Sequence, residues 1–293
     1  MPDDAVLGPT IAVALGAGGA RGLAHIPVLE ALDELGLRPV ALAGTSMGAL
    51  VGAAYAAGIP AKTLRRHTLS VLRDRSRAMA KVLEARVGRF ADVFSGLGNP
   101  LLVDGELILD AFWPEGIPTT FEALAIPFQA VATDYAAREE APFATGSLRP
   151  VVAGSIAIPG LIRPVRLGER LLIDGGASNP LPFDHLIGRA DLVVAVDVAG
   201  GPAAKPGRMP SNFEITMGTI QIMQTAINAA KLKIYRPQVV LTPDVSRFRA
   251  LDFLEARAIF AAAEPAKEAF KRELERHLGG TSLPSPGWER GRG

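Results

Sequence analysis

Ser46 is the residue in this sequence whose surroundings best match those of a nucleophile. Residues 44–48 read G-T-S-M-G, a G-x-S-x-G pattern between the apolar run 40–43 and a stretch rich in alanine and glycine. A short buried strand followed by a thin helix is the context of a nucleophile elbow, in which a strained turn projects a serine hydroxyl above a sheet. Gly44 and Gly48 provide the positions without side chains that let helix and strand approach each other. The pattern also arises by chance in a chain rich in glycine, so the flanking strand and helix carry the prediction.

A glycine-rich turn at residues 16–22, G-A-G-G-A-R-G, follows the apolar run 11–15 and precedes helical spacing over 23–35. A dinucleotide fingerprint would need glycine in place of Arg21 and an acidic residue about 20 positions further on, and neither is present. A phosphate-binding loop would need G-K-[ST], which is also missing. Backbone N–H groups at such a helix N-terminus can instead form a nest for a tetrahedral oxyanion, which is the interpretation we favour over a purely structural turn.

Asp174 is the candidate base, and it directly follows the predicted hairpin formed by 163–167 and 170–173. An Asp-Gly dipeptide alone indicates an ordinary turn. A serine nucleophile needs a base, however, and the four histidines are poor candidates for a triad. Only His185 fits the order Ser, Asp, His of the α/β-hydrolases, and in those proteins the elbow follows several strands, whereas here it follows the second.

Five segments taken in order resemble the bacterial patatin-like phospholipases, and the resemblance covers roughly residues 10–265. They are 16–22 with its Arg21-Gly22, 44–48, 132–134 (A-T-D), 155–160 (S-I-A-I-P-G) leading to R-P-V at 163–165, and 174–176 (D-G-G). The resemblance implies a Ser46–Asp174 dyad without histidine. It also implies an oxyanion hole made by backbone N–H groups of Gly18, Gly19 and Arg21. The elbow and its supporting turns would then include Gly16, Gly22, Gly44, Gly48, Gly175 and Gly176. The loop starts with Gly-Ala where the family has a fuller D-G-G-G form, and alanine still supplies an N–H.

The activity implied by this resemblance is hydrolysis of lipid acyl esters, in phospholipid, lysophospholipid or neutral lipid, through an acyl-enzyme and without calcium, metal or other cofactor. A carboxylate is a weak base for a serine hydroxyl, so we expect Asp174 to be desolvated, to have a raised pKa and to contact Ser46 directly. Two alternatives stay open. One is a non-catalytic lipid-binding or regulatory protein on the same scaffold, and the other is an α/β-hydrolase-type esterase that uses His185.

The elements that would position these residues indicate a three-layer α/β/α sandwich with a mostly parallel central sheet, patatin-like. We expect strands at 11–15, 40–43, 127–133, 192–198 and 238–242, and helices at 104–113, 151–158, 213–234 and 252–278. Residues 1–278 form one domain in this prediction, 62–98 are arginine-rich surface helices with a cap over the active site as the alternative, and 279–293 are a disordered tail. In the helix at 213–234 we expect Met217, Met223 and the isoleucines 215, 220, 222 and 227 to pack into the core, with an acyl-chain groove as the alternative.

Composition excludes several classes of protein. The 293 residues are 48% hydrophobic, which suffices for a sizeable core, and the net charge of +1 argues against nucleic acid as a partner. No cysteine is present, which excludes disulfides, thiolate metal sites and a cysteine nucleophile. Residues 1–10 lack the basic n-region of a secretory signal. We therefore expect a cytoplasmic protein that contacts the inner face of the membrane transiently; the sequence does not define an oligomeric state.

Overall fold

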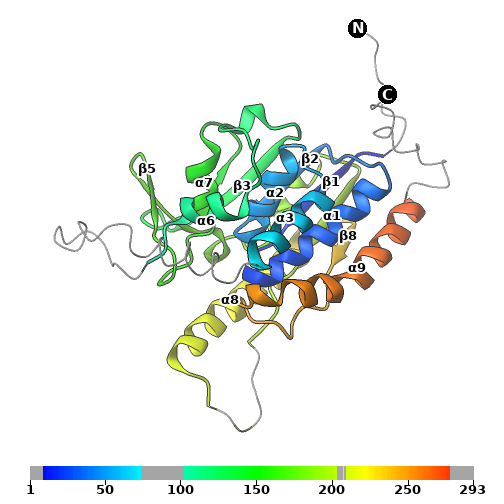
Figure 1. Ribbon diagram of the computed structural model, residues 1–293. Coiled ribbons are helices and arrows are strands. Elements are labelled where there is room, and N and C mark those ends of the chain that lie inside the picture. Colours follow the sequence, from blue (N-terminus) through cyan, green and yellow to red (C-terminus); the bar gives the residue numbers. More distant parts are fainter. Residues whose placement is uncertain (1–8, 74–101, 203–206, 208, 278–293) are drawn as a thin grey trace.

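The computed structural model describes residues 9–73, 102–202, 207 and 209–277 of the chain. Within these ranges an eight-stranded sheet runs through the molecule in the order β5-β6-β3-β2-β1-β7-β8, with β4 paired to β3 (Figure 1). The strands from β3 to β8 along this order are parallel, whereas β4, β5 and β6 pair antiparallel. The strands are β1 (Ile11–Leu15), β2 (Ala41–Thr45), β3 (Phe128–Asp134), β4 (Glu139–Phe143), β5 (Val165–Leu167), β6 (Arg170–Asp174), β7 (Leu192–Val196) and β8 (Val239–Leu241).

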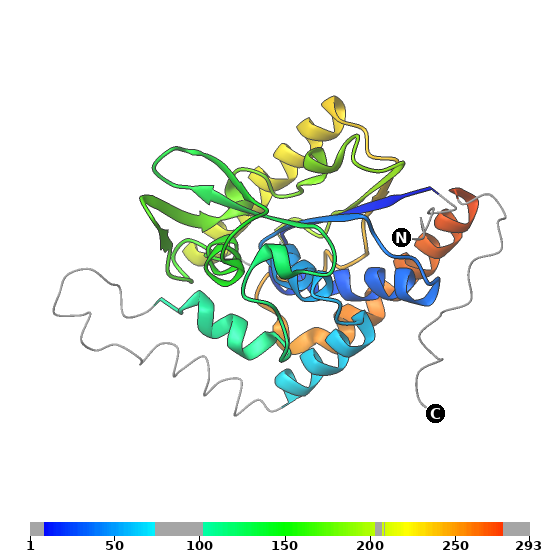
Figure 2. The ribbon, with the colours of Figure 1, turned by 90° about the horizontal axis from the view of Figure 1, so that it is seen from above.

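Helices cover both faces of the sheet (Figure 2). On one face lie α1 (His25–Glu34), α2 (Met47–Ala56), α3 (Ala61–Arg73), α6 (Gly105–Phe112), α7 (Leu148–Ser155) and α9 (Ala256–His277). The long helix α8 (Asn212–Ile234) lies on the other face. Short 3₁₀ turns complete the described elements: η1 (Gly19–Ala24), η2 (Phe121–Ala123), η3 (Gly175–Ala177), η4 (Phe183–Leu186) and η5 (Phe253–Glu255). The fold is the three-layer α/β/α sandwich that the sequence predicts.

The two faces of the sheet differ in the size of their side chains. Successive residues of a strand point to opposite faces, so Ile11, Val13 and Leu15 of β1 join the core under α1, α2 and α9. Ala12 and Ala14 point the other way, as do small residues of β2 and β7, and there they meet Leu181, Phe183 and Leu186. The alanines let the chain around η4 lie close to the sheet. That segment therefore fills the space between the sheet and α8.

Most elements lie where the sequence predicts them, with a few displaced ends. β4 was not expected, because its charged residues and proline lack the apolar alternation of a half-buried strand. α7 begins at Leu148 instead of Val151 and ends at Ser155, three residues short of the expected end, so Pro150 falls in its first turn, where proline is tolerated. Of the expected arginine-rich helices at 62–98, α3 accounts for the part up to Arg73, and 74–98 lie outside the described residues, as does the tail 279–293.

The interpretation of α8 as a helix with an apolar core face is wrong. Its fully buried residues are Gly218, Gln224 and Asn228, whereas Ile222 and Met223 are more than half exposed. The physical reason is that the alanine-rich face of the sheet is already largely covered by residues around η4, and Leu232 is the α8 residue that packs against this cluster. Among the described residues, no helix is both long and apolar enough to cross a bilayer.

Candidate active site

Ser46 occupies the turn between β2 and α2 in a conformation that most residues avoid. Its φ is 56° and its ψ is −121°, a strained combination that persists only where the surroundings hold it. The hydroxyl of Ser155, at the end of α7, accepts the Ser46 N–H at 2.9 Å and donates to the Val131 carbonyl at 2.6 Å. Ser155 is completely buried and thereby fixes the elbow to β3.

Close packing around the elbow requires its glycines. A Cβ on Gly44 would lie 2.4 Å from the carbonyl oxygen of Gly48, and a Cβ on Gly48 would lie 2.0 Å from the carbonyl oxygen of Leu15. Both contacts are with backbone, which cannot move aside cheaply. The other predicted turn glycines are also crowded. A Cβ on Gly175 would lie 2.1 Å from the Val131 oxygen, and one on Gly16 would lie 3.1 Å from the Val196 oxygen. A Cβ on Gly22 would lie 2.4 Å from the Met47 side chain, and one on Gly176 would lie 2.3 Å from the Gln224 side chain.

Asp174 lies in direct contact with Ser46. The Ser46 hydroxyl donates to Asp174 Oδ2 at 2.6 Å, and the Gly176 N–H donates to Asp174 Oδ1 at 2.7 Å. Burial raises the pKa of the Asp174 carboxyl to about 6, against the lowering effect of these two hydrogen bonds. The desolvation and the raised pKa expected from the sequence are therefore present.

Sheet register explains why residues 128 positions apart in sequence meet. β3 pairs with β2 through residues up to Val131, opposite Thr45, and then with β6 from Ala132, opposite Asp174. β4 spans both of these stretches, so it occupies the other edge of β3. β2 and the antiparallel β6 therefore end head to head along one edge, which places Ser46 next to Asp174.

The glycine-rich loop ends beside the dyad and turns into η1. The Gly16, Ala17 and Ala20 amides donate to the carbonyls of Val196, Pro180 and Ala250. Within the described part of the chain, the amides of Gly18 and Gly19 form no such loop contact. Gly19 has φ +58°, and a Cβ on Gly18 would lie 2.6 Å from the Val198 oxygen, so both positions need glycine.

The side chain of Arg21 is buried under this loop, and only 1% of the residue is exposed. Its Nε donates to the Gly18 carbonyl at 3.4 Å. The C=O and N–H of a trans peptide point in opposite directions, so this bond directs the Gly19 N–H away from Arg21. Burial lowers the pKa of Arg21, and the charges of Asp197 and Asp252 oppose that effect. The sequence predicts only its backbone N–H as a donor, and the structure adds this contact of its side chain.

A cavity of about 120 Å³ opens at the dyad, and its surface is mostly apolar. Ser46, Asp174 and Gly176 line it together with Ala17, Gly18, Gly19 and Arg21 of the loop. Its opposite wall is provided by Met217, Ile220, Gln221, Met223 and Gln224 of α8, with Ile158, Pro159, Ala177 and Ala250. The elbow, the turn after β6 and the glycine loop thus converge on one apolar space.

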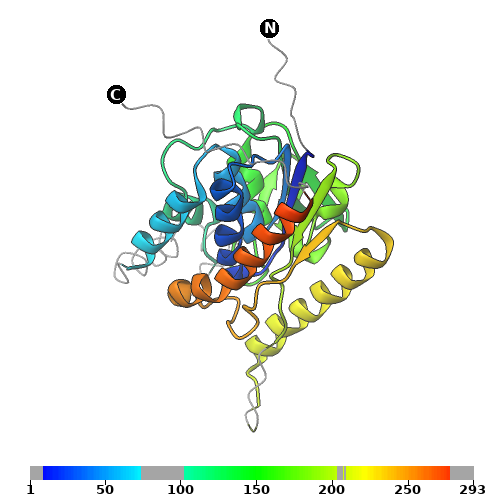
Figure 3. The ribbon, with the colours of Figure 1, turned by 90° about the vertical axis from the view of Figure 1, so that its right-hand side faces the viewer.

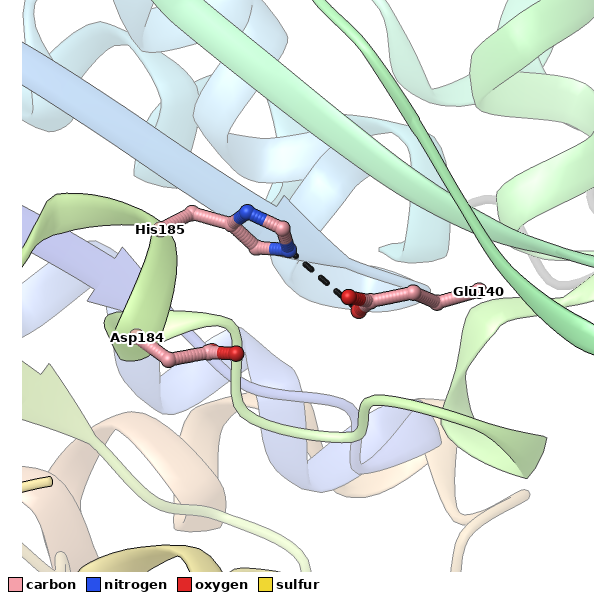
Figure 4. Close-up of side chains that lie close together, drawn as sticks. All are labelled: Glu140, Asp184 and His185. Carbon is pink, nitrogen blue, oxygen red and sulfur yellow. Dashed lines mark hydrogen bonds and ion pairs between the residues drawn. The ribbon is translucent and has the colours of Figure 1, made fainter. Parts of the chain in front are cut away.

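His185 belongs to a different cluster. Its Nε2 lies 3.2 Å from Glu140 Oε2, and Asp184 lies beside the pair (Figure 4). The hydrogen bond from His185 lowers the pKa of Glu140 to about 2, and the same bond raises the pKa of His185. Ligand atoms of the three residues lie within 4.8 Å of one another, but the Lys231 ammonium already bonds to Asp184. The group cross-links β4, η4 and α8, and the geometry gives no support to a triad based on His185.

Two contributors to the site go beyond what the sequence predicts. Ser155 enters the prediction only as the first residue of the segment 155–160, because a serine near a helix end gives no signal of a buried role. For α8 the sequence favours a core position over an acyl-chain groove, and the structure places the helix in a wall of the cavity. His25 also makes a buried contact near the site, because its Nε2 lies 2.8 Å from the Gly16 carbonyl oxygen. That oxygen can only accept a hydrogen bond, so Nε2 carries the proton. Asp134, at the end of β3, accepts hydrogen bonds from the amides of Ala136 and Ala137 and so stabilises the turn that follows.

The fold and the site define a three-layer α/β protein in which a serine in a strained elbow is hydrogen-bonded to a buried aspartate. The model of the patatin-like phospholipase family matches residues 13–187. An uncharacterized NTE family protein of Mycobacterium tuberculosis is 42% identical over 202 residues, which are 67% of this chain and 51% of that protein. Patatin-like phospholipase domain-containing protein 6 of Mus musculus is 35% identical over 196 residues, 65% of this chain and 14% of that protein.

Among solved structures, VipD of Legionella pneumophila covers 91% of this chain and 67% of its own, with 15% identity and a TM-score of 0.48. This chain spans about half the length of the mycobacterial relative and a smaller part of the mouse protein. The chain belongs to the patatin-like phospholipase family, whose members are generally lipid acyl hydrolases.

Proposed function

We propose that this protein is a serine acyl hydrolase that cleaves carboxylic-ester bonds of lipids, with Ser46 as nucleophile and Asp174 as base. The observation that carries the proposal is the 2.6 Å hydrogen bond from the Ser46 hydroxyl to Asp174 Oδ2 at an apolar cavity. A general base must be within hydrogen-bond reach of the proton that it takes, and its pKa should lie near the working pH. A pKa of about 6 for Asp174 meets the second requirement better than an exposed carboxylate would.

The first half of the reaction forms an acyl-enzyme. Asp174 takes the proton of the Ser46 hydroxyl as its oxygen attacks the ester carbonyl carbon, and the carbonyl oxygen becomes an oxyanion. The N–H groups of Gly18 and Gly19 stabilise this charge, in the orientation that Arg21 gives to the Gly19 peptide. The tetrahedral intermediate then collapses. Its bond to the alcohol oxygen breaks, and Asp174 returns the proton to the leaving alcohol.

The second half releases the acid. Asp174 takes a proton from a water molecule, whose oxygen attacks the acyl carbon, and the same amides hold the second oxyanion. When this intermediate collapses, the carbon–oxygen bond to Ser46 breaks and Asp174 gives the proton back to the serine. A fatty acid leaves and the dyad returns to its starting state. The apolar wall formed by Met217, Ile220 and Met223 suits the acyl chain of such a substrate.

The test combines a fluorophosphonate probe, which labels activated serines, with hydrolysis of a soluble short-chain ester. Wild type should be labelled, and Ser46→Ala and Asp174→Asn should lose labelling and about a thousandfold or more in kcat. Ser70→Ala on the exposed side of α3 is the matched serine control and should behave as wild type. Equal labelling of wild type and Ser46→Ala would refute the proposal. Loss of activity in His185→Ala, with Asp174→Asn still active, would assign the base to the histidine.

A further inference from the structure

α8 is attached to the body of the protein by polar side chains. Gln224 and Asn228 are buried, and Asn228 Nδ2 donates to Asp197 Oδ2 at 3.2 Å. One turn further on, Lys231 bonds to Asp184 and to the Leu181 carbonyl, the latter at 3.1 Å. Positions 224, 228 and 231 follow the helical repeat, so they form one stripe facing the sheet. The inner stripe of α8 is therefore polar from Gln224 to Lys231, whereas Met217 and Ile220, earlier in the same stripe, line the cavity.

The opposite face of α8 is apolar and exposed, and Figure 3 shows the helix along the outside of the molecule. Its large side chains and those on its flank, here called the outer α8 surface, are exposed by 50% at Ile215, 57% at Ile222, 53% at Met223 and 72% at Ile234. Residues 215–230 include no charged side chain. A surface helix in water normally has the reverse polarity, and an exposed apolar patch of this kind marks a contact surface.

The outer α8 surface is continuous with the cavity. Met217, Ile220 and Met223 line the cavity, and Met223 belongs to both surfaces. Leu251 follows Ala250, another lining residue, and is itself 45% exposed. An apolar path therefore leads from the dyad to the outside of α8. An occupant of the outer surface would lie next to the entrance of the cavity.

Positive charges flank this uncharged stretch at both ends. Lys233 and Arg236 are exposed at the C-terminal end of α8. At the other end, Arg249 pairs with Asp252 at 3.4 Å, lies 4.0 Å from Glu214, the one acidic residue in the α8 sequence, and keeps 62% of its side chain exposed. An apolar face bounded by lysine and arginine is the pattern of helices that lie in the plane of a lipid interface, where the cations meet anionic headgroups.

We propose that the outer α8 surface docks on a phospholipid bilayer, with α8 in the plane of the interface and the cavity opening into it. The apolar side chains would enter the acyl boundary while Lys233, Arg236 and Arg249 stay at the headgroups. The inference rests on the proposed function only in treating the lipid as the substrate; the docking itself needs no catalysis. It gives a contact to Ile215 and Ile222, which the body of the protein leaves at least half exposed.

The experiment uses the full chain carrying Ser46→Ala, so that binding is measured without hydrolysis. It is sedimented with vesicles of phosphatidylcholine, alone or mixed with an equal amount of phosphatidylglycerol. We expect binding to both, tighter with the anionic lipid and weakened by salt only in that mixture. Adding Ile215→Ser and Ile222→Ser should weaken binding at least tenfold on both. The matched control is Leu107→Ser, which removes an exposed leucine of α6 on the opposite face of the sheet and should leave binding unchanged.

Far-ultraviolet circular dichroism and the melting temperature verify that each variant is folded. Absence of vesicle binding, or equal binding by the isoleucine variant and its control, would overturn the proposal. A lipid-free dimer that Ile222→Ser converts to a monomer would assign the surface to a second copy of the chain and would also overturn it. Vesicle binding without ester hydrolysis by the wild type would refute the proposed function and leave the docking proposal intact. Hydrolysis of soluble esters without vesicle binding would refute the docking proposal and leave the proposed function intact.

Discussion

The replacement Asp174→Asn should make the folded protein more stable at neutral and alkaline pH while it abolishes activity. Asparagine has almost the shape of aspartate. Its oxygen can still accept the Gly176 N–H, and its NH₂ group can donate to the Ser46 hydroxyl, which then acts as acceptor. The variant therefore keeps the hydrogen bonds and removes only the ionisable group.

The magnitude follows from the pKa of Asp174, which burial raises from 3.8 to about 6. This difference of about two units corresponds to roughly 3 kcal/mol. Below about pH 3 the carboxyl is protonated in both the folded and unfolded states, and its burial has no ionisation cost. As pH rises through about 6 the unfolded chain has already lost the proton, and the folded state must hold a buried charge. The gain in the variant should thus be near zero at about pH 3 and reach roughly 3 kcal/mol at about pH 8.

Urea unfolding of wild type and variant at several pH values, followed by fluorescence of the buried Trp113, measures this difference. Only the difference is informative, because His25 acts in the opposite direction. Burial lowers the pKa of His25 to about 4, so the stability that its neutral form contributes is lost as pH falls from about 6.5 to about 4. This contribution is common to both proteins and cancels. A variant that is less stable than wild type at about pH 8, or a gain that does not vary with pH, would refute the account of Asp174 as a desolvated acid.

Three further outcomes follow from the site. The kcat/KM of ester hydrolysis should fall about tenfold per unit as pH drops below about 6, because protonated Asp174 cannot accept the Ser46 proton; a profile still flat at about pH 5 would place the base elsewhere. Ser155→Ala leaves the Ser46 N–H and the Val131 carbonyl without their buried partner, so it should lower the free energy of unfolding in urea by roughly 2–4 kcal/mol. It should also lower kcat more than it raises KM, and an unchanged kcat would contradict the role of Ser155 at the elbow. Gly48→Ala, whose Cβ would lie 2.0 Å from the Leu15 oxygen, should give no soluble active protein. The control Gly201→Ala, whose Cβ would have nothing within 4 Å, should have the yield and activity of wild type. An active Gly48→Ala protein would contradict the packing described for the elbow.

The parallel strands and the elbow were predictable because their signals are local. An apolar run such as Ile11–Leu15 can only be a buried strand or a short piece of buried helix, and the glycine turn after it decides between them. β4 carried no such signal, because Glu139 and Glu140 interrupt the alternation and its pairing depends on β3. Local patterns also placed the ends of α7 poorly, since proline is accepted in a first helical turn as well as in a loop.

The site was predictable as a set of motifs but not as a geometry. The spacing of Ser46 and Asp174 in sequence does not reveal that β2 and β6 end against each other, because that follows from the register of both strands on β3. The environment of α8 was misjudged for a related reason. The apolar content of a helix shows that it has an apolar face, but only the residues around η4, already packed on the sheet, decide that this face points outward.

In the proposed function, the apolar cavity that accepts the acyl chain also lies against the carboxyl of Asp174, whose pKa burial raises. The carboxyl lines that cavity, and its raised pKa comes from burial rather than from a neighbouring negative charge. An acyl chain that fills the cavity displaces water from the carboxylate and raises its proton affinity further, at the moment when the Ser46 proton must be transferred. In the proposed mechanism, Asp174 therefore gains strength as a base from the substrate itself. On this reasoning, longer acyl chains should raise kcat and not only lower KM, until the chain extends beyond the wall formed by α8.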